Sequence, residues 1–164
     1  MPPAARLTDK VAHPLPGNLM PGIGSPNVII GRLPAWRGVP AAVAGALSAA
    51  KAVSEAAIKA AEAVTVAAAG TPGLPAAKAA EETVKATAAA AMGSMISSLG
   101  GMADIHVCAT LLPAPPHGPG VVINGSQTVL INNLPACRLG DTILEAVGPP
   151  DTIIQGDTSV IIGP

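Results

Sequence analysis

The sequence predicts a mainly β protein with pseudo-threefold internal repetition, into which an alanine-rich αα-hairpin is inserted. Three observations predict this fold class. A short unit that opens on glycine and continues as a β-branched run occurs three times. Glycine and proline each occur 18 times, and outside the alanine-rich stretches this density is typical of short strands broken by turns. Two alanine-rich stretches interrupt the second repeat.

The repeat is clearest in residues 24–37, which share eight of fourteen positions with residues 125–138. Residues 156–163 form a partial third copy. A further part of the unit, residues 3–9, matches residues 135–141 at five of seven positions. Each run is rich in Val and Ile and predicts a strand of about five residues. The alternation of residues along each run does not show which apolar positions face the core and which face a partner. The recurring apolar positions are Val28, Ile30, Val129, Ile131, Val160 and Ile162.

The spacing of the repeat locates the insertion. The two parts of the unit are 21 residues apart in two of the copies but 91 residues apart in the middle one, from Pro34 to Gly125. The middle copy therefore carries 70 additional residues. In the other copies an Asp follows the repeated Arg by three residues. In the middle copy, the first Asp after the repeated Arg is Asp104. Most of the insertion must precede this residue.

The inserted residues predict a helical hairpin. Residues 41–69 and 75–92 are dense in alanine, the strongest helix former, and the Pro/Gly-rich residues 70–75 form a turn between them. Charged residues recur at spacings that place them on a solvated helix face. They are Lys51, Glu55, Lys59, Glu62, Lys78, Glu81, Glu82 and Lys85.

The predicted domains are a split β domain, residues 1–38 and 104–164, and an inserted hairpin, residues 39–103. No stable membrane span is expected, because a span needs about 20 predominantly apolar residues and charges interrupt the hairpin as far as Lys85. Residues 86–103 are uncharged but rich in Ser and Gly, and their insertion into a membrane stays open as an alternative.

Composition argues against nucleic-acid binding and for an additional stabilising element. Nine basic residues face ten acidic ones, and Trp36 is the single aromatic residue, so neither a phosphate-binding patch nor a base-stacking platform is expected. A core without Phe or Tyr buries little area per side chain. The N-terminal residues lack the apolar run of a secretory signal. We therefore expect synthesis and assembly in the cytoplasm.

All three histidines and one of the two cysteines make one tetrahedral donor set: His13, His106, Cys108 and His117. His13 and Cys108 each lie four residues after the repeated Asp of their own unit. His106 and Cys108 are two residues apart, which on a strand puts both side chains on one face. Zn²⁺ accepts mixed imidazole and thiolate ligands. The set predicts a closed, structural zinc site, with solvated loop histidines as the alternative.

Charged residues also recur with the repeat. Arg6, Arg37 and Arg138 occupy equivalent positions, and Asp9 and Asp141 follow two of them by three residues. This pattern predicts a structural ion pair or turn clamp in each unit.

No catalytic residue is predicted, and the chain is not expected to be an enzyme. It contains no nucleophile elbow, paired-carboxylate motif or phosphate loop, and a closed zinc site has no open position for water. Cys137 lies among apolar neighbours and is predicted to be a small buried hydrophobe. The alternative, a disulfide between Cys137 and Cys108, is disfavoured by a reducing cytoplasm.

The Pro-Ala-Ala-Arg stretch at residues 3–6, together with the repeated Gly-Ser units, resembles PAAR-repeat (proline-alanine-alanine-arginine) proteins. The resemblance covers about residues 2–38 and 104–164, and Trp36 and Cys137 depart from the motif by replacing its second Ala. It implies a conical PAAR β fold with a metal near its point. The blunt base of such a cone caps the trimeric β-helical spike of a type VI secretion system or related contractile injection system.

Three copies of the unit match a threefold partner, so we expect one cone per trimeric spike, which it sharpens for membrane puncturing. The spike would then carry the tip outside the cell or into a target cell. Two other functions stay open. The hairpin could make the protein an adaptor for an effector or chaperone, or the histidines could serve a zinc-dependent hydrolase toxin with one coordination position open.

Overall fold

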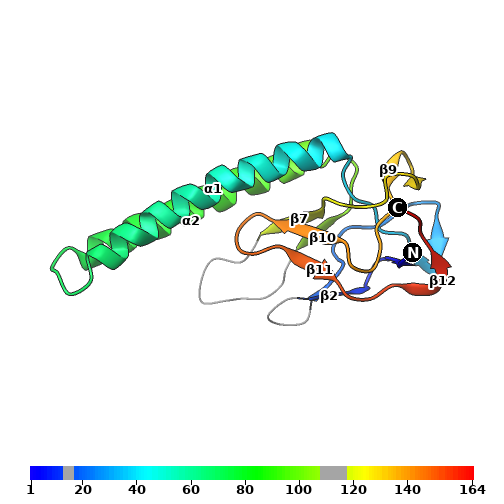
Figure 1. Ribbon diagram of the computed structural model, residues 1–164, viewed down its shortest axis with the longest axis horizontal. Coiled ribbons are helices and arrows are strands. Elements are labelled where there is room, and N and C mark those ends of the chain that lie inside the picture. Colours follow the sequence, from blue (N-terminus) through cyan, green and yellow to red (C-terminus); the bar gives the residue numbers. More distant parts are fainter. Residues whose placement is uncertain (13–16, 108–117) are drawn as a thin grey trace.

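The computed structural model describes residues 1–12, 17–107 and 118–164. A β domain built from short strands carries a long αα-hairpin, as expected, and both termini lie at the same end of the β domain (Figure 1). The two helices are α1 (Ala41–Ala67) and α2 (Leu74–Leu99). The strands are β1 (Pro3–Ala4), β2 (Lys10–Ala12), β3 (Gly17–Asn18), β4 (Ile29–Ile30), β5 (Leu33–Pro34), β6 (Ile105–Val107), β7 (Pro119–Val122), β8 (Leu130–Ile131), β9 (Leu134–Pro135), β10 (Thr142–Glu145), β11 (Asp151–Ile153) and β12 (Asp157–Ile161).

The largest sheet nearly closes into a barrel. Its strand order is β3-β2-β11-β10-β7-β6, with antiparallel pairing throughout. Just after β3 the chain meets β6 at the other edge, where the Gly22 N–H donates to the Ile105 carbonyl (3.1 Å) and the Val107 N–H donates to the Met20 carbonyl (2.8 Å). This closure covers the edges that strands so short would otherwise leave open to aggregation.

A ring of backbone hydrogen bonds relates the three repeats. The Ala5 N–H donates to the Cys137 carbonyl (2.9 Å), the Cys137 N–H to the Trp36 carbonyl (3.0 Å), and the Trp36 N–H to the Ala5 carbonyl (2.9 Å). These three residues hold the same position in the three copies of the motif, so each copy bonds to the next and the last bonds back to the first. The pseudo-threefold arrangement predicted from the repeat is therefore present in the backbone.

Three two-stranded sheets, β1-β12, β4-β5 and β8-β9, surround this axis. Each sheet, together with the residue that directly follows β5, β9 or β12, supplies one Ala of the motif and one Ile of the β-branched run to a shared apolar cluster. The cluster consists of Ala4, Ala35, Ala136, Ile30, Ile131 and Ile162. Of the recurring apolar positions, the three isoleucines thus face the core.

The Arg–Asp clamp predicted for each unit is present in all three. In each, the backbone N–H of the Arg donates to an Asp Oδ2 at 2.8 Å, and the guanidinium pairs with the same carboxylate. The Arg37–Asp104 pair is the most buried, with 4% and 3% of the two side chains exposed. Arg37 and Asp104 flank the insertion. Their pairing therefore holds the two ends of the insertion in the same geometry as the Arg–Asp turns of the shorter units.

Among the described residues, the hairpin packs on the β domain through its proximal end. Ala44 and Leu47 of α1 and Met92 and Ile96 of α2 form one buried cluster with β7 and β10 residues that include Val121. α2 continues to Leu99, beyond the predicted end at residue 92, because Ile96 is fully buried in this cluster.

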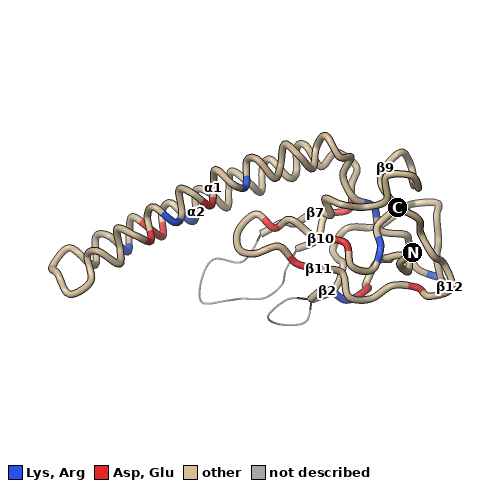
Figure 2. The backbone as a smooth tube through the Cα atoms, in the orientation of Figure 1, with Lys and Arg blue, Asp and Glu red and all other residues tan. Residues whose placement is uncertain are grey.

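Beyond the proximal end, the two helices lie side by side and extend away from the strands (Figure 1). Charged residues gather on this distal part (Figure 2). Lys85 of α2 pairs there with Glu62 of α1 at 2.8 Å.

By length and composition α1 could cross a membrane, whereas the alternative considered from the sequence was membrane insertion of residues 86–103. In this structure Lys51 of α1 is instead buried against the β domain, with its Nζ donating to the Ala146 carbonyl at 3.3 Å.

The clamp makes a first prediction. Asp104→Ala should lower the free energy of unfolding by about 3–5 kcal/mol, because it leaves the buried Arg37 guanidinium without its carboxylate. Chemical denaturation measures the change. Glu82→Ala, on an exposed helix face, is the matched control and should change stability by less than about 0.5 kcal/mol. Equal stability of the two variants would contradict the role of the clamp.

A second prediction separates the two ends of the hairpin. Removing residues 56–87 and joining the stubs with a short Gly/Ser turn should leave the β domain folded, because loop length changes closure entropy only slowly. Removing residues 41–100 should lower the melting temperature markedly, since it uncovers Val121 and Leu144. Thermal unfolding by circular dichroism compares the two deletions. Equal melting temperatures would show that the proximal packing contributes nothing.

Candidate metal centre

Of the four predicted zinc ligands, His106 is the one that the structure describes. It lies on β6 and is 1% exposed. His13, Cys108 and His117 fall outside the described residues, and their convergence on one ion stays a prediction.

Two acidic residues that the sequence reasoning did not select lie beside His106. Glu145 ends β10 and Asp151 begins β11. One donor atom from each of His106, Glu145 and Asp151 lies within 4.8 Å of the others, and the His106 Nε2 is 3.9 Å from a Glu145 Oε1. Imidazole and carboxylate are both donors that Zn²⁺ and other divalent transition metals accept. These residues therefore fit a metal ion.

The electrostatics of the centre are dominated by burial. Glu145 has no exposed surface. Burial, reinforced by the nearby charge of Asp151 and opposed by that of Lys51, raises the pKa of Glu145 to about 9. Burial likewise lowers the pKa of Lys51. A buried carboxylate is costly unless a cation or hydrogen-bond donors compensate its charge, and a bound metal would do so.

The repeat register is the signal that could have found Glu145. Glu145 follows Asp141 by four residues, the same offset at which His13 and Cys108 follow the Asp of their own units. The sequence reasoning applied this offset to two units and did not extend it to the third. Asp151 carries no comparable signal, because only strand pairing brings it alongside β10.

Cys137 behaves as predicted. It is fully buried in the cluster around Trp36, and its thiol is free. Burial, reinforced by the charges of Asp141 and Asp104, raises the pKa of the thiol well above its usual value. Cys137 therefore fills space on the pseudo-threefold axis and carries no reactive thiolate at neutral pH.

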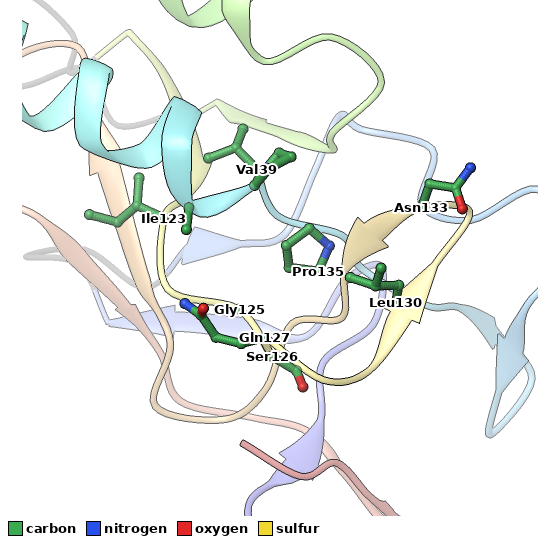
Figure 3. A pocket seen from close by; sticks show the side chains of 10 residues that line it. Val39, Ile123, Gly125, Ser126, Gln127, Leu130, Asn133 and Pro135 are labelled. Atoms are coloured by element: carbon green, nitrogen blue, oxygen red, sulfur yellow. The ribbon is translucent and has the colours of Figure 1, made fainter.

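A pocket of about 210 Å³ lies between the start of α1 and the loop that leads to β8. Figure 3 shows Val39 and Ile123 on one side of it and Leu130 and Asn133 on the other. Among the residues that the structure describes, no acidic, basic or thiol side chain lines this pocket. The Ser126 hydroxyl on its wall donates to the Pro164 carbonyl at 2.8 Å. The pocket thus offers no residue set for hydrolysis.

Residues 112–164 match a family model described as the PAAR motif. Neither a curated protein nor a solved structure matches the chain. With the repeated clamps and the ring at Ala5, Trp36 and Cys137, the match over this third of the chain supports a PAAR-repeat protein that carries an inserted helical hairpin. PAAR domains are structural spike-tip domains, and this points to a non-enzymatic role.

The metal centre gives a third prediction. The purified chain should bind one zinc ion, and stripping the ion with a chelator should lower the melting temperature strongly, because structural zinc contributes of order 10 kcal/mol in small domains. His106→Ala should abolish both the binding and the chelator effect. Metal analysis and thermal unfolding of the variant, with exposed Lys59→Ala as control, measure this. A chelator effect that persisted in His106→Ala would contradict the assignment of His106 as a ligand.

Proposed function

We propose that this chain is the structural tip that caps the trimeric β-helical spike of a contractile injection or type VI secretion apparatus. One cone would sit on one trimer, assembled in the cytoplasm of a bacterium and then delivered outside or into a target cell. The proposed division is the split cone of residues 1–38 and 104–164 with the inserted hairpin of residues 39–103. The proposed cofactor is structural zinc near the point.

The single observation that carries this proposal is an exposed apolar ring with pseudo-threefold spacing. Ile29, Leu130 and Ile161 hold the same place in the three repeats, one residue before the buried isoleucines. Their exposed fractions are 56%, 56% and 48%. A charge-free residue recurring at one exposed position in all three units fits contact with a partner of the same symmetry.

Two features of the fold support docking at this ring. Each exposed residue lies on its own two-stranded sheet, whose outer edge could also pair with a strand of the partner. The distal hairpin extends away from the end that holds β9, β12 and both termini (Figure 1). It therefore leaves this end free for the spike. The proposed action is mechanical: the cone closes the open end of the spike, and its metal keeps the point folded during puncture.

A fourth prediction tests the ring. Changing Ile29, Leu130 and Ile161 together to Glu should lower affinity for the trimeric spike by at least about 100-fold, since interface anchors contribute about 2 kcal/mol or more each. The fold should survive, because these side chains are already about half exposed. Calorimetric titration of the trimer measures affinity and stoichiometry, with one chain per trimer expected.

The matched control is Val66→Glu, which places the same charge on an apolar residue of the distal hairpin that is 74% exposed. It should bind the spike as the unmodified chain does. Unchanged affinity of the triple variant, or a stoichiometry of three chains per trimer, would overturn the proposed docking mode.

A second role, as an adaptor for an effector or chaperone, is favoured by the surface of the hairpin. Val53, Val64 and Val66 of α1 are 73%, 61% and 74% exposed, on the part that extends beyond the β domain (Figure 1). The shortened hairpin described above, without residues 56–87, would remove Val64 and Val66 and leave the apolar ring. It should then lose any such cargo while it still caps the spike.

A further inference from the structure

The two-residue turns that join β4 to β5 and β8 to β9 hold equivalent places in the repeat. Gly31 and Arg32 form the first turn, and Asn132 and Asn133 form the second. All four residues have a positive φ, from 52° to 72°, which is the geometry of tight hairpin turns whose twist matches that of the flanking strands. The two turns therefore share one backbone geometry but carry different second residues, Arg32 and Asn133.

Arg32 is an unfavourable residue for this turn. Gly adopts a positive φ readily and Asn tolerates it, whereas in other residues the Cβ comes too close to the following carbonyl oxygen. Packing does not explain Arg32 either, because the residue is exposed. A residue held in a strained conformation that the fold itself does not require points to a role for its side chain.

The positive charge of Arg32 is also uncompensated. The three two-stranded sheets and their two turns comprise residues 3–4, 29–34, 130–135 and 157–161, in which Arg32 and Asp157 are the charged residues. Asp157 pairs with Arg6 at 2.6 Å. The Arg32 guanidinium forms no ion pair within the part of the chain that the structure describes. One unpaired cation thus lies on the sheets that carry the apolar ring.

This cation lies beside the ring. In the second unit, Leu130 of the ring and Asn133 of the turn line one pocket, and Figure 3 shows both on the same hairpin. β4 pairs with β5 in the same register as β8 pairs with β9. Arg32 therefore has the same relation to Ile29 as Asn133 has to Leu130. A partner that covers Ile29 would also meet Arg32.

We propose that Arg32 forms an ion pair with a carboxylate that each subunit of the trimeric spike presents beside the surface that covers the ring. This inference rests on the proposed spike capping and names a chemical feature of that partner. A guanidinium suits a carboxylate, because the two groups form parallel hydrogen bonds. A phosphate surface would instead need a cluster of basic residues, and Arg32 is a single charge on these sheets.

The test exchanges residues between the two equivalent turns and measures binding to the trimeric spike by calorimetric titration at several salt concentrations. Arg32→Asn should lower the affinity about three- to tenfold at low ionic strength and weaken its salt dependence, because salt screens the ion pair. Asn133→Arg should raise the affinity by a similar factor, since a second subunit would place its carboxylate beside that turn. The double variant that carries both changes should bind as the unmodified chain does.

Thermal unfolding separates this role from a structural one. Arg32→Asn should melt at the temperature of the unmodified chain or above it, because Asn suits a positive φ better than Arg does. Lys59→Asn removes the same charge from an exposed position on the distal hairpin. This control should leave the spike affinity and its salt dependence unchanged.

Two results would overturn the ion pair: unchanged spike affinity of Arg32→Asn, or a double variant that binds no better than Arg32→Asn alone. Binding to phosphatidylglycerol vesicles that Arg32→Asn loses, with its spike affinity unchanged, would assign Arg32 to a lipid surface instead. Loss of spike binding in the triple Glu variant of the ring, with unchanged affinity of Arg32→Asn, would keep the capping and exclude the ion pair. If the unmodified chain does not bind the spike, both proposals are wrong.

Discussion

Three backbone hydrogen bonds, which join Ala5, Trp36 and Cys137 in a ring, are the constraint on which the rest of this structure depends. They tie each copy of the motif to the next, so three short segments far apart in the sequence form one closed unit. The side chains at these positions share a buried cluster. One large residue and two small ones fill it together, which explains why Trp36 and Cys137 can replace the Ala of the motif without breaking the fold.

The clamp explains how one unit accepts a long insertion. The Asp104 N–H donates to the Arg37 carbonyl at 3.0 Å, close to the 3.1 Å of the corresponding bonds at Asp9 and Asp141. The chain thus leaves and re-enters the turn at nearly the same place, and closing a longer loop adds little entropy cost. The helices nevertheless contribute to the core, because Leu47 and Ile96 are fully buried against the β domain.

The β domain divides its two proposed tasks between different kinds of side chain. Ile29, Leu130 and Ile161 offer an apolar surface that repeats with the symmetry of the fold. His106 and Glu145, in contrast, hold different places in their units, two and four residues after the repeated Asp, and both are buried on strands of the six-stranded sheet. Docking to a threefold partner needs equivalent residues, whereas a metal needs a set of donors around one point. The same repeat supplies both by conserving one position and varying another.

The sequence by itself determined the repeat, the clamps and the inserted hairpin, because each depends on residue identity at a fixed spacing. Only the tertiary structure decided that Ile30 faces the core and Ile29 the solvent, since the run of β-branched residues does not alternate with polar ones. It also brought Asp151 to His106 across three intervening strand pairings. Such contacts depend on strand order and register, which local patterns in the sequence do not contain.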